Sequence, residues 1–431
     1  MGDAMPAVGP DPLPTEWNYT LLSNFSQNGV PARWAHGSPQ AWGHEQRAVF
    51  IGQDATSLSL SQDEQFVAVA CGQGVEILAT RLDPPQGLSI GTGPDDWIVC
   101  HIEWYTQEKS SQKSNRLLVC RVSPVPALPG GKRDAVVQIY SLDEESWSMV
   151  PVPGLKFPCL SRKGSNQRMV NNQGERVLLF SRPSTGSADS SSGKVVVQSL
   201  SDPSNGSILP IESRDVTWLG FSPDSSTIGI VTSDRQIHIL DAESGQIKSA
   251  TSQLEAQINA AAFSPDGSKM AATCSSINAS VQVFSTSDGS RLLTVPFQQI
   301  TRSLAWSPDG KTLAYGAQGG HLELFDLEAG RQVQTWQLEY PAVRPSPLNE
   351  PGDIQFVDDG SKQLFSTGME GGVEVYDLRS NVKRRFEPGA ENDFLQGKKR
   401  SLVAWSSRDR TAIVLDGDGY LRFWECEEAI N

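Results

Sequence analysis

A short strand pattern of apolar, polar, apolar and bulky apolar residues recurs seven times along the chain and restricts its fold most strongly. The copies occupy residues 75–78, 137–140, 237–240, 281–284, 322–325, 373–376 and 421–424. From residue 237 onward, their starts lie 44, 41, 51 and 48 residues apart. Alternation with a period of two places every second side chain on one buried side of a β-strand. A strand that returns at this spacing indicates a repeat architecture built from similar β units.

A turn with the sequence aromatic-Ser-Pro-Asp-Gly precedes several copies of this strand. It is complete at residues 263–267 and 306–310, one residue short at 221–225, and decayed at 356–360 and 405–409. Pro presets φ for a tight turn, Asp bonds its own backbone, and Gly supplies a positive φ. With a strand before this turn, a strand after it and a fourth strand after an acidic-Gly turn, each unit predicts four antiparallel strands. Such a unit is a propeller blade.

These turns and the strand end at residues 324–330 (Leu-Phe-Asp-Leu-Glu-Ala-Gly) resemble the WD-repeat (WD40) family. The resemblance covers roughly residues 47–426 and is strongest from 213 to 335. It implies a β-propeller that acts as a non-catalytic scaffold for protein–protein interactions, typically within a multi-protein complex. The chain departs from the family pattern because the Gly-His pair expected ahead of the first strand is missing from every copy. The Trp-Asp dipeptide is also replaced, and where Trp424 keeps the Trp, Glu425 follows it. The family's usual hydrogen-bond network is therefore incomplete, and we expect apolar packing to hold the blades.

We count eight repeat units, which predicts an all-β propeller of eight four-stranded antiparallel blades. The third unit is weak around residues 170–180, so a seven-bladed ring with one irregular insertion is the alternative. The last unit ends after Trp424 without an outer strand, and residues 48–51 can supply that strand and close the ring. The predicted domains are an N-terminal extension (1–46) and the propeller (47–431).

The N-terminal extension lacks a strand pattern but contains several prolines together with Trp17, Trp34 and Trp42. Tryptophans at this density favour packing against the wall of the ring. A short partner-binding motif is the alternative interpretation.

The sequence offers little support for an enzyme. The five histidines, at positions 36, 44, 101, 238 and 321, are scattered and lack partners at metal-ligand spacing. His238 occupies the polar position of an alternating strand and is expected to be a blade residue rather than a base. No phosphate-binding glycine loop or nucleophile elbow occurs. We therefore predict no catalytic, metal or cofactor site, with a propeller hydrolase or lactonase that binds metal in its channel as the alternative.

The formal net charge of −14 bears on the choice of partners. It argues against general nucleic-acid binding, which needs a basic surface to displace counterions. An acidic surface suits a basic client, because complementary fields speed and select encounters. A dedicated chaperone for a ribosomal or histone-like protein is therefore the second hypothesis beside the interaction scaffold.

Basic clusters stand out against this acidic background and are the candidate partner-binding residues. They are Lys383, Arg384 and Arg385, then Lys398, Lys399 and Arg400, with Arg344 nearby on the same predicted face. They are interpreted either as a solvated strand edge and loop or as a dock for an acidic peptide or phosphate. The long insertions at 123–134, 183–193, 341–352 and 387–399 fall on one predicted face, which we expect to bind the main partner.

The remaining signals concern the compartment. No apolar run approaches the length of a membrane helix or a signal sequence, so we expect no membrane association. The six cysteines form no Cys-x-x-Cys pair, and Cys71, Cys120 and Cys274 lie in predicted strands. We interpret them as reduced core residues, with Cys71 and Cys274 buried, of a cytoplasmic or nuclear protein.

Overall fold

The computed structural model places most of the chain from residue 26 to residue 426. It describes residues 26–27, 30–31, 33–35, 40–41, 43–52, 55–81, 87–91, 97–109, 112–123, 135–158, 168–181, 193–202, 204–211, 215–275, 280–296, 301–317, 321–337, 354–358, 360, 362–366, 373–387, 402–416 and 418–426. Within these ranges the chain forms strands and turns, and none of it is a helix that could cross a membrane.

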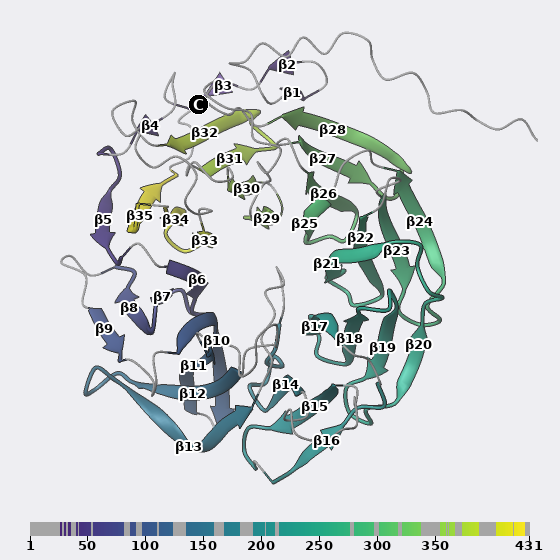
Figure 1. Ribbon diagram of the computed structural model, residues 1–431. Helices are drawn as coiled ribbons and strands as arrows, with labels where there is room; N and C mark the ends of the chain where they lie inside the picture. The colour runs from purple at the N-terminus through teal and green to yellow at the C-terminus, as the bar shows by residue number, and fades with distance from the viewer. Residues whose placement is uncertain are drawn as a thin grey trace, which may run out of the picture.

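Eight sheets follow one another around a central axis, with the last strand of each sheet at the rim (Figure 1). Blade 1 contains β6 (Ala55–Leu60), β7 (Phe66–Cys71), β8 (Gly74–Ala79) and β9 (Gly87–Ile90). Blade 2 contains β10 (Ile98–Lys109), β11 (Gln112–Val122), β12 (Ala135–Asp143) and β13 (Ser148–Pro158). Blade 3 contains β14 (Arg176–Ser181), β15 (Lys194–Ser199) and β16 (Gly206–Ile208). Blade 4 contains β17 (Val216–Phe221), β18 (Thr227–Thr232), β19 (Ile237–Asp241) and β20 (Ile247–Ala250).

The second half of the ring repeats the same order. Blade 5 contains β21 (Gln257–Phe263), β22 (Lys269–Ser275), β23 (Ser280–Ser285) and β24 (Arg291–Pro296). Blade 6 contains β25 (Thr301–Trp306), β26 (Thr312–Ala317), β27 (His321–Asp326) and β28 (Arg331–Gln337). Blade 7 contains β29 (Ile354–Val357), β30 (Lys362–Ser366), β31 (Val373–Asp377) and β32 (Val382–Glu387). Blade 8 contains β33 (Leu402–Ser406), β34 (Thr411–Leu415), β35 (Tyr420–Glu425) and β5 (Arg47–Phe50).

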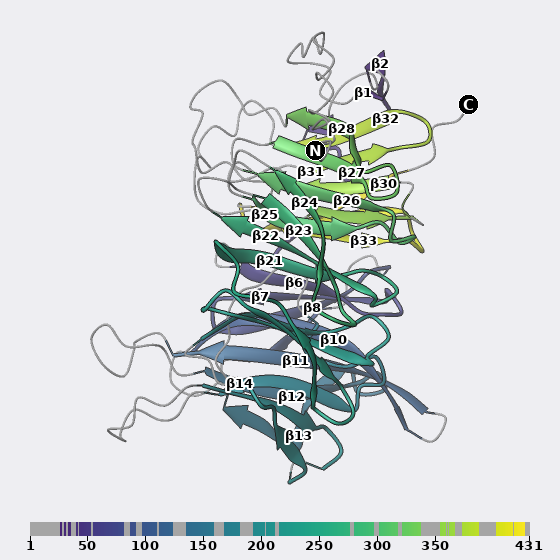
Figure 2. The ribbon, with the colours of Figure 1, turned by 90° about the vertical axis from the view of Figure 1, so that its right-hand side faces the viewer.

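The prediction of eight blades is confirmed, and the seven-bladed alternative does not hold. Every alternating segment that the sequence marked lies in the third strand of its blade, from β8 to β35. Blade 3 is the irregular unit. An isolated bridge between Val170 and Val177 stands where the other blades have a first strand. The strands run across the thickness of the ring, so their turns lie on its two faces (Figure 2).

Apolar side chains fill the spaces between neighbouring blades. Between blades 4 and 5, the rings of Trp218 and Phe263 meet edge to face with centroids 6.0 Å apart. Ile237 and Ile239 from the third strand of blade 4 pack into the same cluster as Met270 from blade 5. A fully buried large apolar side chain contributes about 1.5–3 kcal/mol. Burial between neighbouring blades thus contributes substantially to the stability of the ring.

The Ser-Pro-Asp-Gly turns are fixed by the Ser and Asp side chains. In blade 5, Ser264 Oγ donates to Asp266 Oδ1 at 2.6 Å and accepts from the Lys269 backbone N–H at 2.9 Å. The hydroxyls of Ser264 and Ser268 lower the Asp266 pKa to about 2. Gly267 adopts a φ of 70°, which explains the glycine of the motif.

The last blade takes its outer strand from the N-terminal side of the chain. β5 pairs antiparallel with β35, with Val49 opposite Leu421 and Arg47 opposite Phe423. The Arg47 guanidinium carbon lies 3.6 Å from the centroid of the Phe423 ring, and its Nη2 donates to the Thr80 carbonyl at 2.9 Å. β5 therefore contacts both blade 8 and blade 1.

A carboxylate from blade 1 completes the decayed turn of blade 8. Glu64 Oε2 accepts hydrogen bonds from Ser406 Oγ and from the Arg408 backbone N–H, both at 2.8 Å. Arg81 of blade 1 also pairs with Asp409 in that turn. Polar contacts across blades thus supplement the apolar packing where the turn motif has decayed.

Candidate functional site

The first basic cluster of the sequence lies in β32, the outer strand of blade 7. Lys383, Arg384 and Arg385 are 1%, 5% and 8% exposed. Both interpretations of this cluster assumed an exposed strand edge, and the burial corrects that assumption. The physical reason is that other parts of the chain cover the edge.

Two short strands from the N-terminal extension add to β32 in parallel. β3 (Arg33–Trp34) pairs with residues 382–383, and β4 (Gln40–Ala41) pairs with residues 386–387 (Figure 1). The Arg33 N–H donates to the Asn381 carbonyl at 3.1 Å, and the Ala35 N–H donates to the Lys383 carbonyl at 3.0 Å. This arrangement is strand addition to an open sheet edge, a recurring mode of peptide recognition.

Side chains strengthen the contact at both ends of the basic cluster. Lys383 Nζ lies 4.0 Å from the centroid of the Trp34 ring, within the range of a cation–π interaction. Arg385 Nη1 lies 3.5 Å from Glu374 Oε1 of β31, and both side chains are buried. Trp34 is half-buried on the ring wall, whereas Trp17 and Trp42 lie outside the described residues.

A buried ionic cluster anchors the extension where it joins the ring. Arg422 of β35 contacts Asp416 and Asp418 at 3.0 and 2.5 Å. Glu45 Oε1 lies 3.5 Å from Arg422 Nε. The chain is therefore held to blade 8 a few residues after β4.

The other predicted partner-binding residues cannot be compared with this geometry. Arg344, Lys398, Lys399 and Arg400 lie outside the described residues, as do most residues of the four long insertions. Binding through them and through the loop-rich face stays a prediction.

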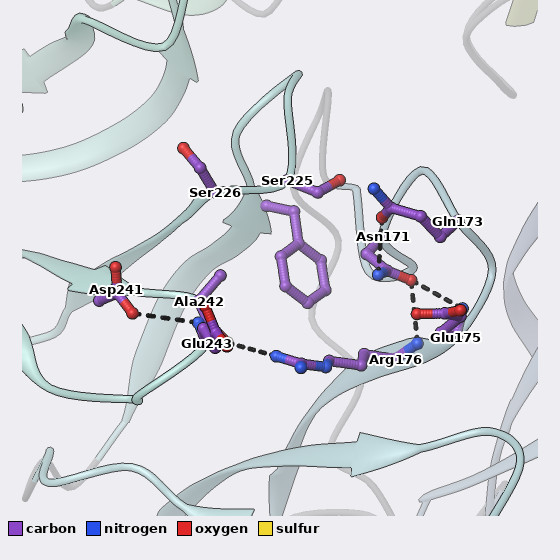
Figure 3. A pocket seen from close by; sticks show the side chains of 10 residues that line it. Asn171, Gln173, Glu175, Arg176, Ser225, Ser226, Asp241, Ala242 and Glu243 are labelled. Carbon is purple, nitrogen blue, oxygen red and sulfur yellow. Dashed lines mark hydrogen bonds between the residues drawn. The ribbon is translucent and has the colours of Figure 1, made fainter.

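A polar cleft of about 310 Å³ lies between blades 3 and 4, on the face that carries the short turns (Figure 3). Asn171 builds its blade 3 side. The side-chain Oδ1 accepts from the N–H groups of Glu175 and Arg176 at 2.8 and 2.9 Å. Arg176 Nη1 then crosses to blade 4 and donates to the Ala242 carbonyl at 2.7 Å.

Carboxylates surround this cleft. Glu175, Asp241 and Glu243 line it, together with Arg176 as the one cation among the lining residues. The N–H and hydroxyl of Ser244 and the ammonium of Lys248 hold the Asp241 pKa far below its usual value, so that carboxylate stays ionised. The cleft therefore has three carboxylates and one guanidinium in its lining, and Lys248 already pairs with Asp241 at 3.1 Å.

Sequence reasoning missed this cleft, although it recognised the decayed turn at residues 170–174. The sequence does not show which turns lie next to each other across a blade boundary. The one usable signal was Asn171, which replaces the Ser-Asp pair of the regular turns and marks this turn as different.

Groups that could perform chemistry are sparse in the described part of the chain. There, no three His, Cys, Asp or Glu side chains lie close enough together to hold a metal ion. His238 lies half-buried in β19, and burial lowers its pKa. Cys120 and Cys274 are buried as expected, whereas Cys71 is only partly buried because it ends β7.

Comparison with known proteins agrees with the fold. Residues 294–347 match the family model of the anaphase-promoting complex subunit 4 WD40 domain. A WD repeat-containing protein, SL1-17 of Schistosoma mansoni, is 31% identical over 119 residues. That match covers 27% of this chain and 38% of the relative, so the chain spans well under half of the relative's length.

Two solved structures resemble the whole ring. Sqt1 of Saccharomyces cerevisiae has a TM-score of 0.63 at 13% identity, covering 89% of this chain and 99% of that one. Sqt1 of Chaetomium thermophilum, solved bound to the N-terminus of the ribosomal protein L10, has a TM-score of 0.59 at 17% identity and the same coverage. At these identities the likeness concerns the fold. The repeated turns, the eight blades and these matches agree with the fold of a WD-repeat (WD40) β-propeller.

Proposed function

We propose that this protein is a non-catalytic scaffold that binds other proteins, as a subunit or adaptor of a multi-protein complex. The observation that carries the proposal is the strand addition on blade 7. β32 holds two extended segments through backbone hydrogen bonds and a cation–π contact. A rim that binds extended chain in this way can bind segments of other proteins by the same physics.

Affinity purification of the full-length protein from its own cells, with quantitative mass spectrometry, tests this function. We expect one or a few proteins at near-stoichiometric amounts that persist through washing. Recovery of the protein without any partner above background, at its natural abundance, would contradict the proposal.

A dedicated chaperone for a basic client is the second candidate. The net charge of −14 and the carboxylate-lined cleft between blades 3 and 4 support it. The structural likeness to an Sqt1 solved with the N-terminus of a ribosomal protein supports it by analogy of fold.

Charge reversal in the cleft distinguishes the two candidates. Under the chaperone reading, the double variant Glu175→Lys, Glu243→Lys loses a basic client that the parent protein binds in a salt-sensitive manner. A matched control, Glu144→Lys with Glu145→Lys, changes net charge equally at the exposed turn of blade 2. Equal loss of the client in both double variants would show that net charge matters and the cleft does not.

A further inference from the structure

We infer that Phe50 and Tyr420, on the outer two strands of blade 8, form a contact surface for a basic extended segment of a partner protein. The rings come from β5 and β35, which lie side by side at the rim of the ring (Figure 1). The inference deepens the proposed function and rests on it, because it assigns one contact surface and the chemistry of the segment that binds there.

The two rings stand out among the exposed side chains of the described residues. Phe50 is 58% exposed and Tyr420 is 38% exposed, and their ring centroids lie 5.1 Å apart. The other exposed large hydrophobic side chains in the described part are aliphatic and lie on the outer strands of four different blades, at positions 150, 208, 247 and 292. Single aliphatic residues of this kind are ordinary on protein surfaces. Adjacent aromatic rings, in contrast, are typical of the centre of a protein–protein interface.

The backbone holds both rings in place. Phe50 and Tyr420 lie opposite each other in the register of β5 and β35. The Ile51 N–H donates to the Gly419 carbonyl at 2.9 Å, and the Tyr420 N–H donates to Asp418 Oδ1 at 3.0 Å. A partner that contacts the rings therefore has little of this protein to order, and the surface is preorganised for binding.

An extended segment can reach the rings by adding to β5. This strand is the last of its sheet, so its outer edge pairs with no strand in the described part of the chain. Burial alternates along β5, and Ala48 and Phe50 are its exposed residues. Strand addition would place every second side chain of the incoming segment beside these two residues, where the rings are accessible.

The rings favour a cationic side chain at that position, because the face of an aromatic ring attracts guanidinium and ammonium groups. The same two strands already contain such contacts. The guanidinium carbon of Arg47 lies 3.6 Å from the centroid of the Phe423 ring. That of Arg422 lies 5.1 Å from the centroid of the Tyr420 ring. Within the described ranges no cation lies over the Phe50 ring, so a cation of the partner can bind there.

Charge also selects a basic segment and argues against a second copy of this chain. Three carboxylates contact the guanidinium of Arg422, which lies next to Tyr420. They belong to Glu45, Asp416 and Asp418. The formal net charge of the chain is −14, so two copies repel each other, whereas a basic segment is attracted. The expected occupant is therefore an extended segment with Arg or Lys at alternate positions.

Binding of a designed probe to the full-length protein tests the inference. The probe is a fluorescent peptide with the sequence Ser-Thr-Arg-Thr-Arg-Thr-Ser. Its matched control carries citrulline in place of both arginines, which keeps the shape and removes the charge. We expect the arginine probe to bind at least about tenfold more tightly than the citrulline probe, with an affinity that falls as salt rises. Fluorescence anisotropy measures both affinities.

Variants of the full-length protein locate the bound probe. Phe50→Ala and Tyr420→Ala should each weaken the arginine probe roughly tenfold, whereas Tyr420→Phe keeps the ring and should retain the affinity. Leu292→Ala removes a side chain that is 53% exposed on the outer strand of blade 5, and it should leave the affinity unchanged. If one alanine variant is unfolded, the other variant and the comparison of the two probes on the parent protein still decide.

Equal affinity of the parent for the two probes, no detectable binding of the arginine probe at millimolar concentration, or an equal loss in Leu292→Ala would overturn the inference. A dimer of the parent that Phe50→Ala dissociates would also overturn it, because the occupant would then be a second copy. Failure of this surface can be told apart from failure of the scaffold. A stoichiometric cellular partner that both alanine variants retain leaves the scaffold standing and removes the surface. Probe binding as expected by a protein without any cellular partner supports the surface and contradicts the scaffold.

Discussion

Removal of β5 should open the ring between its first and last blades. Deleting residues 47–50 removes four registered pairs with β35, from Phe50 with Tyr420 to Arg47 with Phe423. It also removes the contact of Arg47 with the Thr80 carbonyl. The exposed edge of β35 would then resemble an unprotected sheet edge, which invites association with other chains.

The magnitude follows from the hydrogen bonds. About five backbone hydrogen bonds at about 0.5–1.5 kcal/mol each amount to roughly 3–7 kcal/mol. That is a large fraction of the 5–15 kcal/mol typical of folded domains. For a ring of this size, about 2 cal/mol/K per residue of unfolding entropy converts this loss into a fall of roughly 4–9 °C in Tm.

Differential scanning calorimetry of the deletion variant and its parent measures the effect. We expect the lower Tm together with a broader, less cooperative transition. Two point variants on β5 test whether packing matters. Val49→Ser removes an apolar side chain that packs against the cluster between blades 8 and 1, and it should lower Tm. Ala48→Ser changes an exposed side chain and should leave Tm unchanged. A deletion variant that melts within one or two degrees of the parent refutes the idea that β5 closes the ring.

Three further outcomes test the packing and the turns. Cys274 should react slowly with a thiol reagent in the native protein, because burial raises its pKa to about 11, and the partly buried Cys71 should react first. The reverse order in mass-spectrometric labelling would contradict the described burial. Asp266→Asn should lower Tm at pH 7 and should lower it much less near pH 2. The lowered pKa of Asp266 contributes stability above pH 4 that is lost as the pH falls through about 2, and an equal effect at both pH values argues against this. Glu64→Ala should cost about 1.5–3 kcal/mol in urea unfolding, because the carboxylate accepts two hydrogen bonds. Arg81→Ala, which removes an exposed ion pair that solvent screens, should cost less than Glu64→Ala, and the opposite ranking would refute the assignment.

The regular blades were predictable because their sequences carry two independent local signals. In blade 5, the turn at residues 263–267 and the alternating strand at 281–284 can each be recognised from a few consecutive residues. In blade 3 the turn has decayed and a single bridge between Val170 and Val177 replaces the first strand in the described residues, so its sequence signal is weaker.

The candidate sites depend on contacts that a single sequence does not encode locally. Lys383, Arg384 and Arg385 look like an exposed basic run in the sequence. In the structure they are buried, and the strand that pairs beside them comes from some 350 residues earlier in the chain. Glu64 likewise acts in a turn at the other end of the chain. The sequence shows that these residues are charged or lie in a decayed turn. Which residues they contact depends on how the two ends of the chain meet in the closed ring.

The native mass of the protein in a gently prepared extract of its own cells tests the scaffold claim most directly. Size-exclusion chromatography with native mass spectrometry at natural abundance would give that mass. We predict that most of the protein migrates in a hetero-oligomeric assembly of defined stoichiometry. Migration of nearly all of it as the isolated chain, at low and at physiological salt, would contradict the claim.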